Sequence, residues 1–219
     1  MSKPPPCLSK VRFGSFLAYS PRGSSANSSL SRRIMYGIKN ARVGYIKGTL
    51  NWLREEMAPG KSAELLNDVL GRDVLVVPCP RSSPLLEGAL WPSKLICDEL
   101  VSQGLARESA AILKRVTAVT KSSTAAAGER PKPLDHIKSM EVDDQTNFAA
   151  ERITIVDDII TKGSTLLGAA SHIQEVFPTA KIWVFALVRT TGLIPDVDKV
   201  IDPVIGEVAL NGSDANRQP

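Results

Sequence analysis

The segment ITIVDDIITKGST, residues 153–165, combines residue types that together could hold a sugar phosphate. Apolar residues lead into two adjacent carboxylates, Asp157 and Asp158, and a loop of hydroxyl and glycine residues then opens a helical pattern. Carboxylates can bind sugar hydroxyls or a metal ion, but not a phosphate. A helix start offers unpaired amides and the positive end of the helix dipole, which suit a phosphate. The pattern therefore indicates a ribose 5-phosphate site.

Two common phosphate-binding motifs do not occur in the sequence. The order at residues 162–165 is Lys-Gly-Ser-Thr, and the position five residues before Gly163 is Asp158 rather than the leading glycine of G-x-x-x-x-G-K-[ST]. No G-x-G-x-x-G follows a predicted strand either. A coincidental acidic pair on the surface of a plain α/β domain is the remaining alternative. The hydroxyl and glycine residues that follow the pair argue against it.

The composition fits an ordinary folded domain and excludes several kinds of site. With 219 residues, 43% of them hydrophobic, the chain can bury a sizeable core. Its three cysteines are widely spaced without a C-x-x-C, so neither a zinc ribbon nor a disulfide framework is predicted. No apolar stretch approaches the roughly 20 residues of a membrane helix, and no secretory signal is evident. We therefore expect a cytoplasmic protein with no membrane partner.

Strands and helices are predicted to alternate, which indicates a mostly parallel sheet flanked by helices. We expect a mostly helical N-terminal extension at 1–70, an α/β domain at 71–207 and a disordered tail at 208–219. The predicted strands are 11–19, 73–80, 111–119, 152–158, 181–189 and 198–205. The predicted helices are 43–57, 62–70, one capped by Ser93 that ends at Gly104, and one over 166–177, with Ser/Gly-rich residues 20–31 as a loop.

Residues 153–165 closely resemble the phosphoribosyl-diphosphate signature of type I phosphoribosyltransferases: an apolar strand, two acidic residues and a T-x-G-x-T-like loop. More loosely, residues 35–192 resemble the ComF-like branch of that family. The features that carry this second resemblance are Pro78-Cys79-Pro80 followed by Arg81, the ILKRV strand, the GERP loop and the strand ending at Arg189. The chain lacks the N-terminal zinc-ribbon cysteines of competence-type members, so their role in DNA uptake does not carry over directly. The resemblance implies a type I phosphoribosyltransferase-like fold with an N-terminal helical extension, and a hood over the sugar site formed by the N-terminal helices at about 30–70 or by the segment after Arg189.

The resemblance also implies roles for individual residues. Asp157 and Asp158 would hold the 2- and 3-hydroxyls of the ribose, and magnesium would bind near them through the substrate rather than through dedicated protein ligands. The residues expected to cradle the 5-phosphate are Thr161, Lys162, Gly163, Ser164 and Thr165. The residues expected at the diphosphate are Cys79, Pro80, Arg81 and Ser82, with Arg81 catalytic beside the two aspartates.

The polar stretch 120–145 resembles the family's flexible catalytic lid, which excludes water from the reacting centre. Lys121 and Arg130 would be its cations, and Arg115 would lie at its base. Simple solvent exposure is the alternative for each lid cation, and a solvated loop arginine is an equal alternative for Arg81. His136, a lone histidine in a polar stretch, is interpreted as exposed, and His172 as structural.

Two functions from different classes stay open at this point. The first is a phosphoribosyltransferase that releases diphosphate as the phosphoribosyl group passes to a nitrogen acceptor. The second is a catalytically silent protein that senses a phosphoribosyl compound or a nucleotide monophosphate, or an accessory protein in DNA uptake or defence. The net charge of +4 leaves a nucleic-acid partner open without requiring one. The acceptor, the segment that forms the hood and a homodimeric state are equally open.

Overall fold

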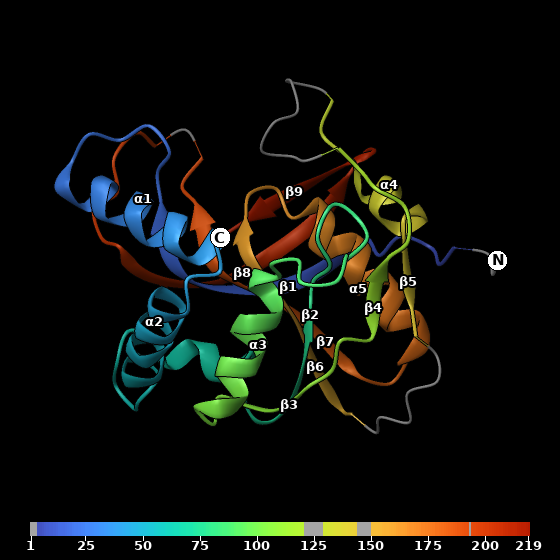
Figure 1. The fold of residues 1–219 in the computed structure, drawn as a ribbon, viewed down its shortest axis with the longest axis horizontal. Coiled ribbons are helices and arrows are strands. Elements are labelled where there is room, and N and C mark those ends of the chain that lie inside the picture. The colour runs from blue at the N-terminus through green and yellow to red at the C-terminus, as the bar shows by residue number, and fades with distance from the viewer. Residues whose placement is uncertain (1–3, 121–128, 144–149, 193) are drawn as a thin grey trace.

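The computed structural model describes residues 4–120, 129–143, 150–192 and 194–219, which fold around one seven-stranded sheet (Figure 1). Its strand order is β3-β2-β6-β7-β1-β8-β9. Every pairing from β3 to β1 is parallel, whereas β8 and β9 are antiparallel to their neighbours. The strands are β1 (Lys10–Tyr19), β2 (Gly71–Pro78), β3 (Ala106–Ser109), β6 (Arg152–Ile160), β7 (Lys181–Thr190), β8 (Ile201–Asn211) and β9 (Asp214–Gln218). The architecture is mixed α/β with a mostly parallel sheet, as the sequence predicts.

Helices cover both faces of the sheet, which explains the continuous apolar runs of the central strands. In β2, Val74 and Val76 face one core cluster, whereas Leu75 and Val77 face the other. The first cluster contains residues of α1 (Ala26–Lys39), α2 (Val43–Glu56), the 3₁₀ helix η1 (Glu64–Asp68) and α3 (Pro92–Ser102). The second cluster contains residues of α5 (Ser164–Val176), on which α4 (Pro133–Lys138) packs. None of the described helices is both long enough and apolar enough to cross a membrane.

The division predicted at residue 70 does not match the sheet. β1 lies between β7 and β8, paired in parallel with one and antiparallel with the other. The helices that follow it pack on the sheet: Ile34 of α1 and Leu50 of α2 share a core cluster with Phe16 of β1. The predicted loop at 20–31 is also too long, because α1 begins at Ala26 with Ser25 as its N-cap. The N-terminal region is therefore part of the α/β body.

The prediction of a disordered tail at 208–219 is wrong. β8 and β9 form a hairpin around Gly212, which has the positive φ of 59° that such a tight turn needs. Val208 is completely buried and Ala215 nearly so, both in the cluster that contains Phe13. Alternate apolar residues and the Asn-Gly turn were therefore a hairpin signal, hidden by the polar residues between them.

Two segments are shorter or more structured than predicted. The strand predicted at 111–119 is limited to β4 (Leu113–Arg115), which pairs with β5 (Met140–Val142) in a separate antiparallel pair. The polar stretch 120–145 contains α4 and β5, so it is not one continuous loop. Within the connection between β3 and β6, α4 and β5 thus pack on α5 as a small additional layer.

Replacing Val208 by Ala should lower the free energy of unfolding by about 2 kcal/mol, because two buried methyl groups and their packing are lost. Urea unfolding measures this change. The control is Asn216→Ala at an exposed position of β9, which should change the free energy by less than about 0.5 kcal/mol. Equal, negligible effects of the two substitutions would contradict an ordered hairpin.

Candidate functional site

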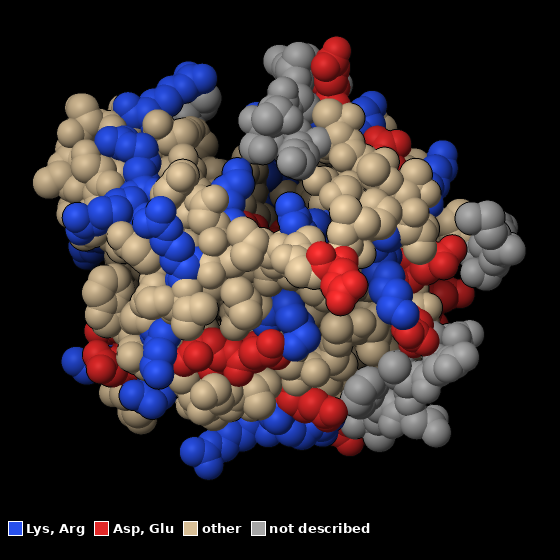
Figure 2. All heavy atoms as spheres, in the orientation of Figure 1, with Lys and Arg blue, Asp and Glu red and all other residues tan. Residues whose placement is uncertain are grey.

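The acidic pair lies where β6 loses its neighbour on one side. β2 pairs with β6 only as far as Pro78 opposite Val156, whereas β7 continues to Arg189 opposite Ile160. Asp157 and Asp158 are therefore held by the sheet on the β7 side and open on the β2 side. They lie within the strand, which runs to Ile160, two residues beyond its predicted end at 158. Figure 2 shows a hollow at this carboxyl edge, with acidic and basic side chains in its floor.

The two carboxylates are partly buried and have few compensating partners. The Asp157 Oδ1 atom accepts hydrogen bonds from the Ser93 hydroxyl at 3.1 Å and from the Asp158 amide at 2.9 Å. Burial and the adjacent Asp158 raise the pKa of Asp157 well above its ordinary value. Burial also raises the pKa of Asp158, partly offset by hydrogen bonding with Asp157, by the Ile159 amide at 2.9 Å and by the Lys39 ammonium. Ionisation of both carboxylates is therefore unfavourable, and hydroxyl donors or a cation beside them would favour it.

Ser93 contributes to the site in a way that differs from its prediction. It is buried in the first turn of α3, whose N-cap is Trp91, and its hydroxyl reaches Asp157 instead of capping the helix. The contact joins residues 64 positions apart, so no local pattern indicates it.

The loop after β6 brings the chain directly into the start of α5. Gly163 is the N-cap of α5 with φ of 92°, a conformation that glycine adopts without strain. It is also a point of close approach, since a Cβ there would lie 2.7 Å from Val208 Cγ1 of β8. The amides that open α5 have no acceptor within the helix. The predicted phosphate loop, Thr161 to Thr165, therefore has the backbone geometry of an anion site.

The segment after β2 lies beside the acidic pair and is fixed by hydrogen bonds. The Cys79 amide donates to the Val156 carbonyl at 2.8 Å, and the Trp91 indole donates to the Cys79 carbonyl at 2.8 Å. Pro80 is buried, and the Ser82 carbonyl accepts from the Val119 amide at 2.7 Å. The Arg81 guanidinium donates to the Leu90 carbonyl at 2.6 Å, closing the loop that leads to α3. These predicted diphosphate residues thus directly follow the strand next to the aspartates.

Arg115 and His136 connect the Cys79–Ser82 segment to the phosphate loop through a chain of polar contacts. Arg115 is buried, and its Nε donates to the Arg81 carbonyl at 2.8 Å. A second guanidinium nitrogen donates to the Ser139 hydroxyl at 2.5 Å, and the third lies 3.3 Å from His136 Nδ1. His136 Nε2 in turn lies 3.2 Å from Thr165 Oγ1. Arg115 is thus engaged with protein acceptors, and its direct contact with substrate stays a prediction.

The protonation of His136 follows from these partners. Arginine has only donors, so Nδ1 must accept and the ring proton must lie on Nε2, which donates to Thr165. Burial and the Arg115 charge lower the pKa of His136 to about 3, so the ring is neutral at pH 7. Thr165 is then free to donate its own hydroxyl proton into the phosphate loop. The interpretation of His136 as exposed is wrong, because it lies buried between α5 and β4.

The C-terminal hairpin contacts the phosphate loop from the other side. The Asp214 carboxylate accepts from the Lys162 ammonium and, at 3.5 Å, from the Ser164 hydroxyl. Arg217 donates to the Thr161 carbonyl at 2.9 Å and to the Thr190 carbonyl at 2.6 Å. A carboxylate therefore already lies at the start of α5, where the sequence predicts a phosphate.

The two segments that the sequence offers as a hood form one unit. The Asp196 carboxylate, in the segment after β7, accepts from the Ser25 amide at 2.8 Å and the Ser28 hydroxyl at 3.0 Å at the start of α1. Beside this contact a cavity of about 480 Å³ opens at the carboxyl ends of β1 and β7, and its lining includes Ala18, Thr190 and Arg217. Arg217 lines this cavity and also contacts the Thr161 carbonyl, so the two candidate hood segments lie near the phosphate loop.

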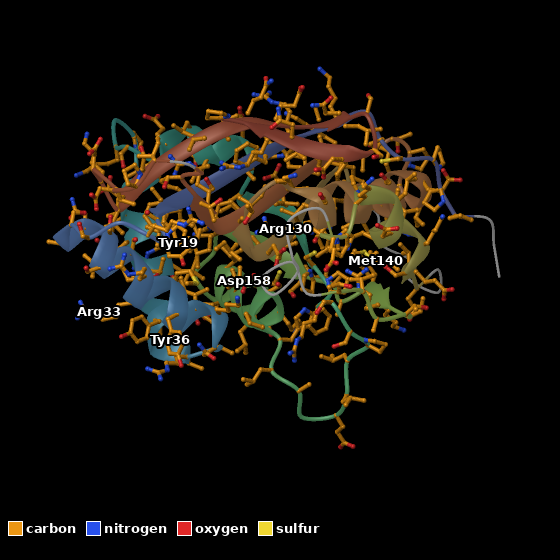
Figure 3. All side chains as sticks on the ribbon, turned by 90° about the horizontal axis from the view of Figure 1, so that it is seen from above. Tyr19, Arg33, Tyr36, Arg130, Met140 and Asp158 are labelled. Carbon is orange, nitrogen blue, oxygen red and sulfur yellow. The ribbon has the colours of Figure 1, made fainter. Side chains whose placement is uncertain are left out.

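The structure gathers most of the predicted residues at one edge of the sheet. Seen from above in Figure 3, the labelled Tyr19, Asp158 and Arg130 lie toward the middle of that edge. Arg130 is exposed. Lys121, the other predicted lid cation, lies outside the described residues. His172 is buried with its Nε2 2.8 Å from the Ile137 carbonyl, which agrees with a structural role.

Comparison with known proteins leaves the family open. No family model matches the sequence, and no curated protein matches it. Among solved structures, an adenine phosphoribosyltransferase from Leishmania donovani is similar over 84% of each chain, with 10% sequence identity and a TM-score of 0.34. A likeness at this TM-score carries no argument about function.

The His136 network predicts a specific loss of stability in acid. The folded-state pKa of about 3 lies below the ordinary 6.5, so between these values the unfolded chain binds the proton and the folded chain does not. Stability should therefore fall as the pH drops from 6.5 toward 3. Between pH 6.5 and pH 5 the wild type should lose about 2 kcal/mol more than His136→Gln, which cannot be protonated. Urea unfolding at each pH measures this, and parallel pH profiles would contradict a neutral buried ring.

Proposed function

We propose that the chain binds phosphoribosyl diphosphate with magnesium and transfers the phosphoribosyl group to a nitrogen acceptor, releasing diphosphate. One observation carries the proposal: an acidic pair and the start of a helix lie together within residues 157–165 at the carboxyl edge of the sheet. Ligands of open α/β sheets bind at this edge. A sugar with adjacent hydroxyls and a 5-phosphate satisfies both parts, since hydroxyls donate to carboxylates and the phosphate accepts from amides.

The residues of the chain would act mainly by positioning and charge. Asp157 and Asp158 accept from the ribose hydroxyls, and the residues from Thr161 to Thr165 hold the 5-phosphate. The bond from C1 to the diphosphate oxygen breaks with its electron pair leaving on diphosphate, while the acceptor nitrogen forms the new bond to C1. The loop from Cys79 to Ser82, with Arg81, follows the neighbouring strand β2, where its donors would stabilise the charge on the leaving group.

The residues present suit magnesium that arrives with the substrate. Among the described residues no group of three or more histidine, cysteine, aspartate or glutamate side chains forms a metal site. Magnesium commonly binds to one or two carboxylates together with substrate phosphates, and Asp157 and Asp158 supply such carboxylates. When bound, the ion would neutralise charge on the diphosphate.

A second function is favoured by the hairpin contact. Asp214 lies at the start of α5, so a phosphate that binds there must displace a like-charged group. This arrangement suits a catalytically silent sensor of a phosphoribosyl compound or nucleotide monophosphate, in which ligand binding moves the β8–β9 hairpin. Diphosphate release in the presence of a panel of nitrogen bases distinguishes the two functions, because only the transferase gives turnover.

Asp157→Asn should weaken binding of phosphoribosyl diphosphate with magnesium by about 10- to 100-fold, since a charged hydrogen-bond acceptor is lost.

The same substitution should stabilise the fold above pH 3.8. The raised pKa of Asp157 means that the folded state holds a proton which the unfolded state releases, so the wild type loses stability as the pH rises. Calorimetry and urea unfolding measure the two effects. No binding to the wild type at millimolar ligand would remove the proposed function, and weaker binding with lower stability would reduce Asp157 to a structural residue.

Asp214→Asn should tighten phosphoribosyl diphosphate binding by about 3- to 10-fold, because the competing carboxylate is neutralised without loss of volume. Glu207→Gln on the same hairpin is the matched control, since Glu207 pairs with Lys10 rather than with the phosphate loop. Calorimetry should show no change for the control. Unchanged or weaker binding by Asp214→Asn would place the phosphate elsewhere.

A further inference from the structure

The charge of this chain is strongly segregated along the sequence. Residues 1–54 contain ten lysines and arginines and no acidic residue, and the first acidic residue is Glu55. The remaining residues carry 17 basic and 23 acidic side chains, so the net charge of +4 conceals a basic N-terminal quarter and an acidic remainder. A segregation of this kind concentrates a positive field on whichever surface the first 54 residues form.

Most of these basic side chains are exposed on the α1–α2 unit. The exposed ones, here called the basic face, are Arg22, Arg33, Lys39, Arg42, Lys47 and Arg54. None of them forms an ion pair within the described part of the chain, where the six pairs all involve other residues. Figure 2 shows basic side chains gathered over α1. The face therefore has charge available for a partner.

The other described basic side chains of the segment have structural partners, and Lys3 lies outside the described residues. Arg12 lies over the Trp183 ring, 4.4 Å from its centre, and Lys10 pairs with Glu207. Arg32 donates to the Gly23 carbonyl and the Ser29 hydroxyl. The contrast shows that the unpaired charge is a property of one face and not of the whole segment.

An aromatic side chain lies among these cations. Tyr36 is 56% exposed, and the Arg42 guanidinium lies 5.4 Å from the centre of its ring. Figure 3 shows the labelled Arg33 and Tyr36 at the outer side of the molecule, on the α1–α2 unit. Exposed aromatic rings between arginines and lysines are typical of surfaces that stack the bases of single-stranded nucleic acids while cations follow the phosphates.

The α1 part of this face does not suit a lipid surface, whereas α2 exposes Val43 and Trp52. A helix that binds in a membrane interface presents large apolar side chains beside its basic ones. In α1 the large aliphatic residues Ile34 and Ile38 are buried in the core, and the exposed neighbours of the cations include Ser29 and Asn40. At its end near the cleft, Lys39 lies close enough to Asp158 to influence that carboxylate.

We infer that the basic face of α1 and α2 binds a single-stranded nucleic acid, with its cations on the phosphates and Tyr36 stacked on a base. The inference does not depend on the proposed transferase activity, because it concerns a different surface and needs no turnover.

The test is fluorescence anisotropy of the full chain with labelled single-stranded DNA and RNA of about 16 nucleotides, over a range of salt concentrations. The triple variant Arg33→Ala, Lys39→Ala, Arg42→Ala should bind more weakly. The slope of log K against log salt should become shallower by about 2, near 0.7 for each lost phosphate contact. The control, Arg72→Ala, Lys138→Ala, Lys181→Ala, removes the same charge from exposed positions on β2, α4 and β7 and should retain the wild-type slope.

Tyr36→Ala separates stacking from charge. It should weaken oligonucleotide binding about tenfold with an unchanged salt slope. Equal loss in the two triple variants, or polyphosphate that binds as tightly as the oligonucleotides, would reduce the surface to a non-specific charge effect and overturn the inference. Binding to vesicles of anionic lipid without binding to oligonucleotides would overturn it in favour of a membrane. Circular dichroism melting of each variant checks that these exposed substitutions leave the fold intact.

Discussion

The one-sided pairing of β6 is the constraint on which the site depends. β7 hydrogen-bonds with β6 to its last residue, while β2 stops at Pro78, so the two aspartates are held rigidly and yet open to one side. The neighbouring strand end, freed at the same level, turns into the Cys79–Ser82 segment. The difference in length between β2 and β6 therefore exposes the acidic pair on one side, leaves a gap beside it and places a loop next to that gap.

Two like-charged carboxylates lie together at this edge of the sheet, and the contacts around them hold the adjacent loops in place. Burial raises the pKa of both aspartates, a cost that a structure retains where ligand binding relieves it. The surrounding contacts are directed at holding the loops still: Arg115 reaches the carbonyl of one loop and, through His136, the hydroxyl of the other. His136 is neutral at pH 7, and its contact with Arg115 sets its tautomer. The hydrogen-bonded connection between the two loops therefore requires no proton transfer at pH 7.

The C-terminal hairpin has two separate effects. It extends the sheet beyond β1, where Val208 completes a core cluster and prevents any side chain larger than that of glycine at position 163. It also places Asp214 and Arg217 on the phosphate loop, so that the loop is contacted by the edge of the sheet as well as by its own helix. The proposed ligand site thus depends on residues more than 50 positions after the aspartates.

The sequence by itself determined the local parts of this protein. The buried runs of β2 and β7, the amphipathic helix α2, and the order strand, acidic pair, loop and helix at 153–165 all follow from short-range periodicity and turn chemistry. Only the tertiary structure decided the contacts that join distant segments: β1 between β7 and β8, Ser93 on Asp157, His136 on Thr165 and Asp214 on Ser164. Such contacts leave no local signal, because whether a polar side chain is exposed or buried against a partner depends on which strands become neighbours.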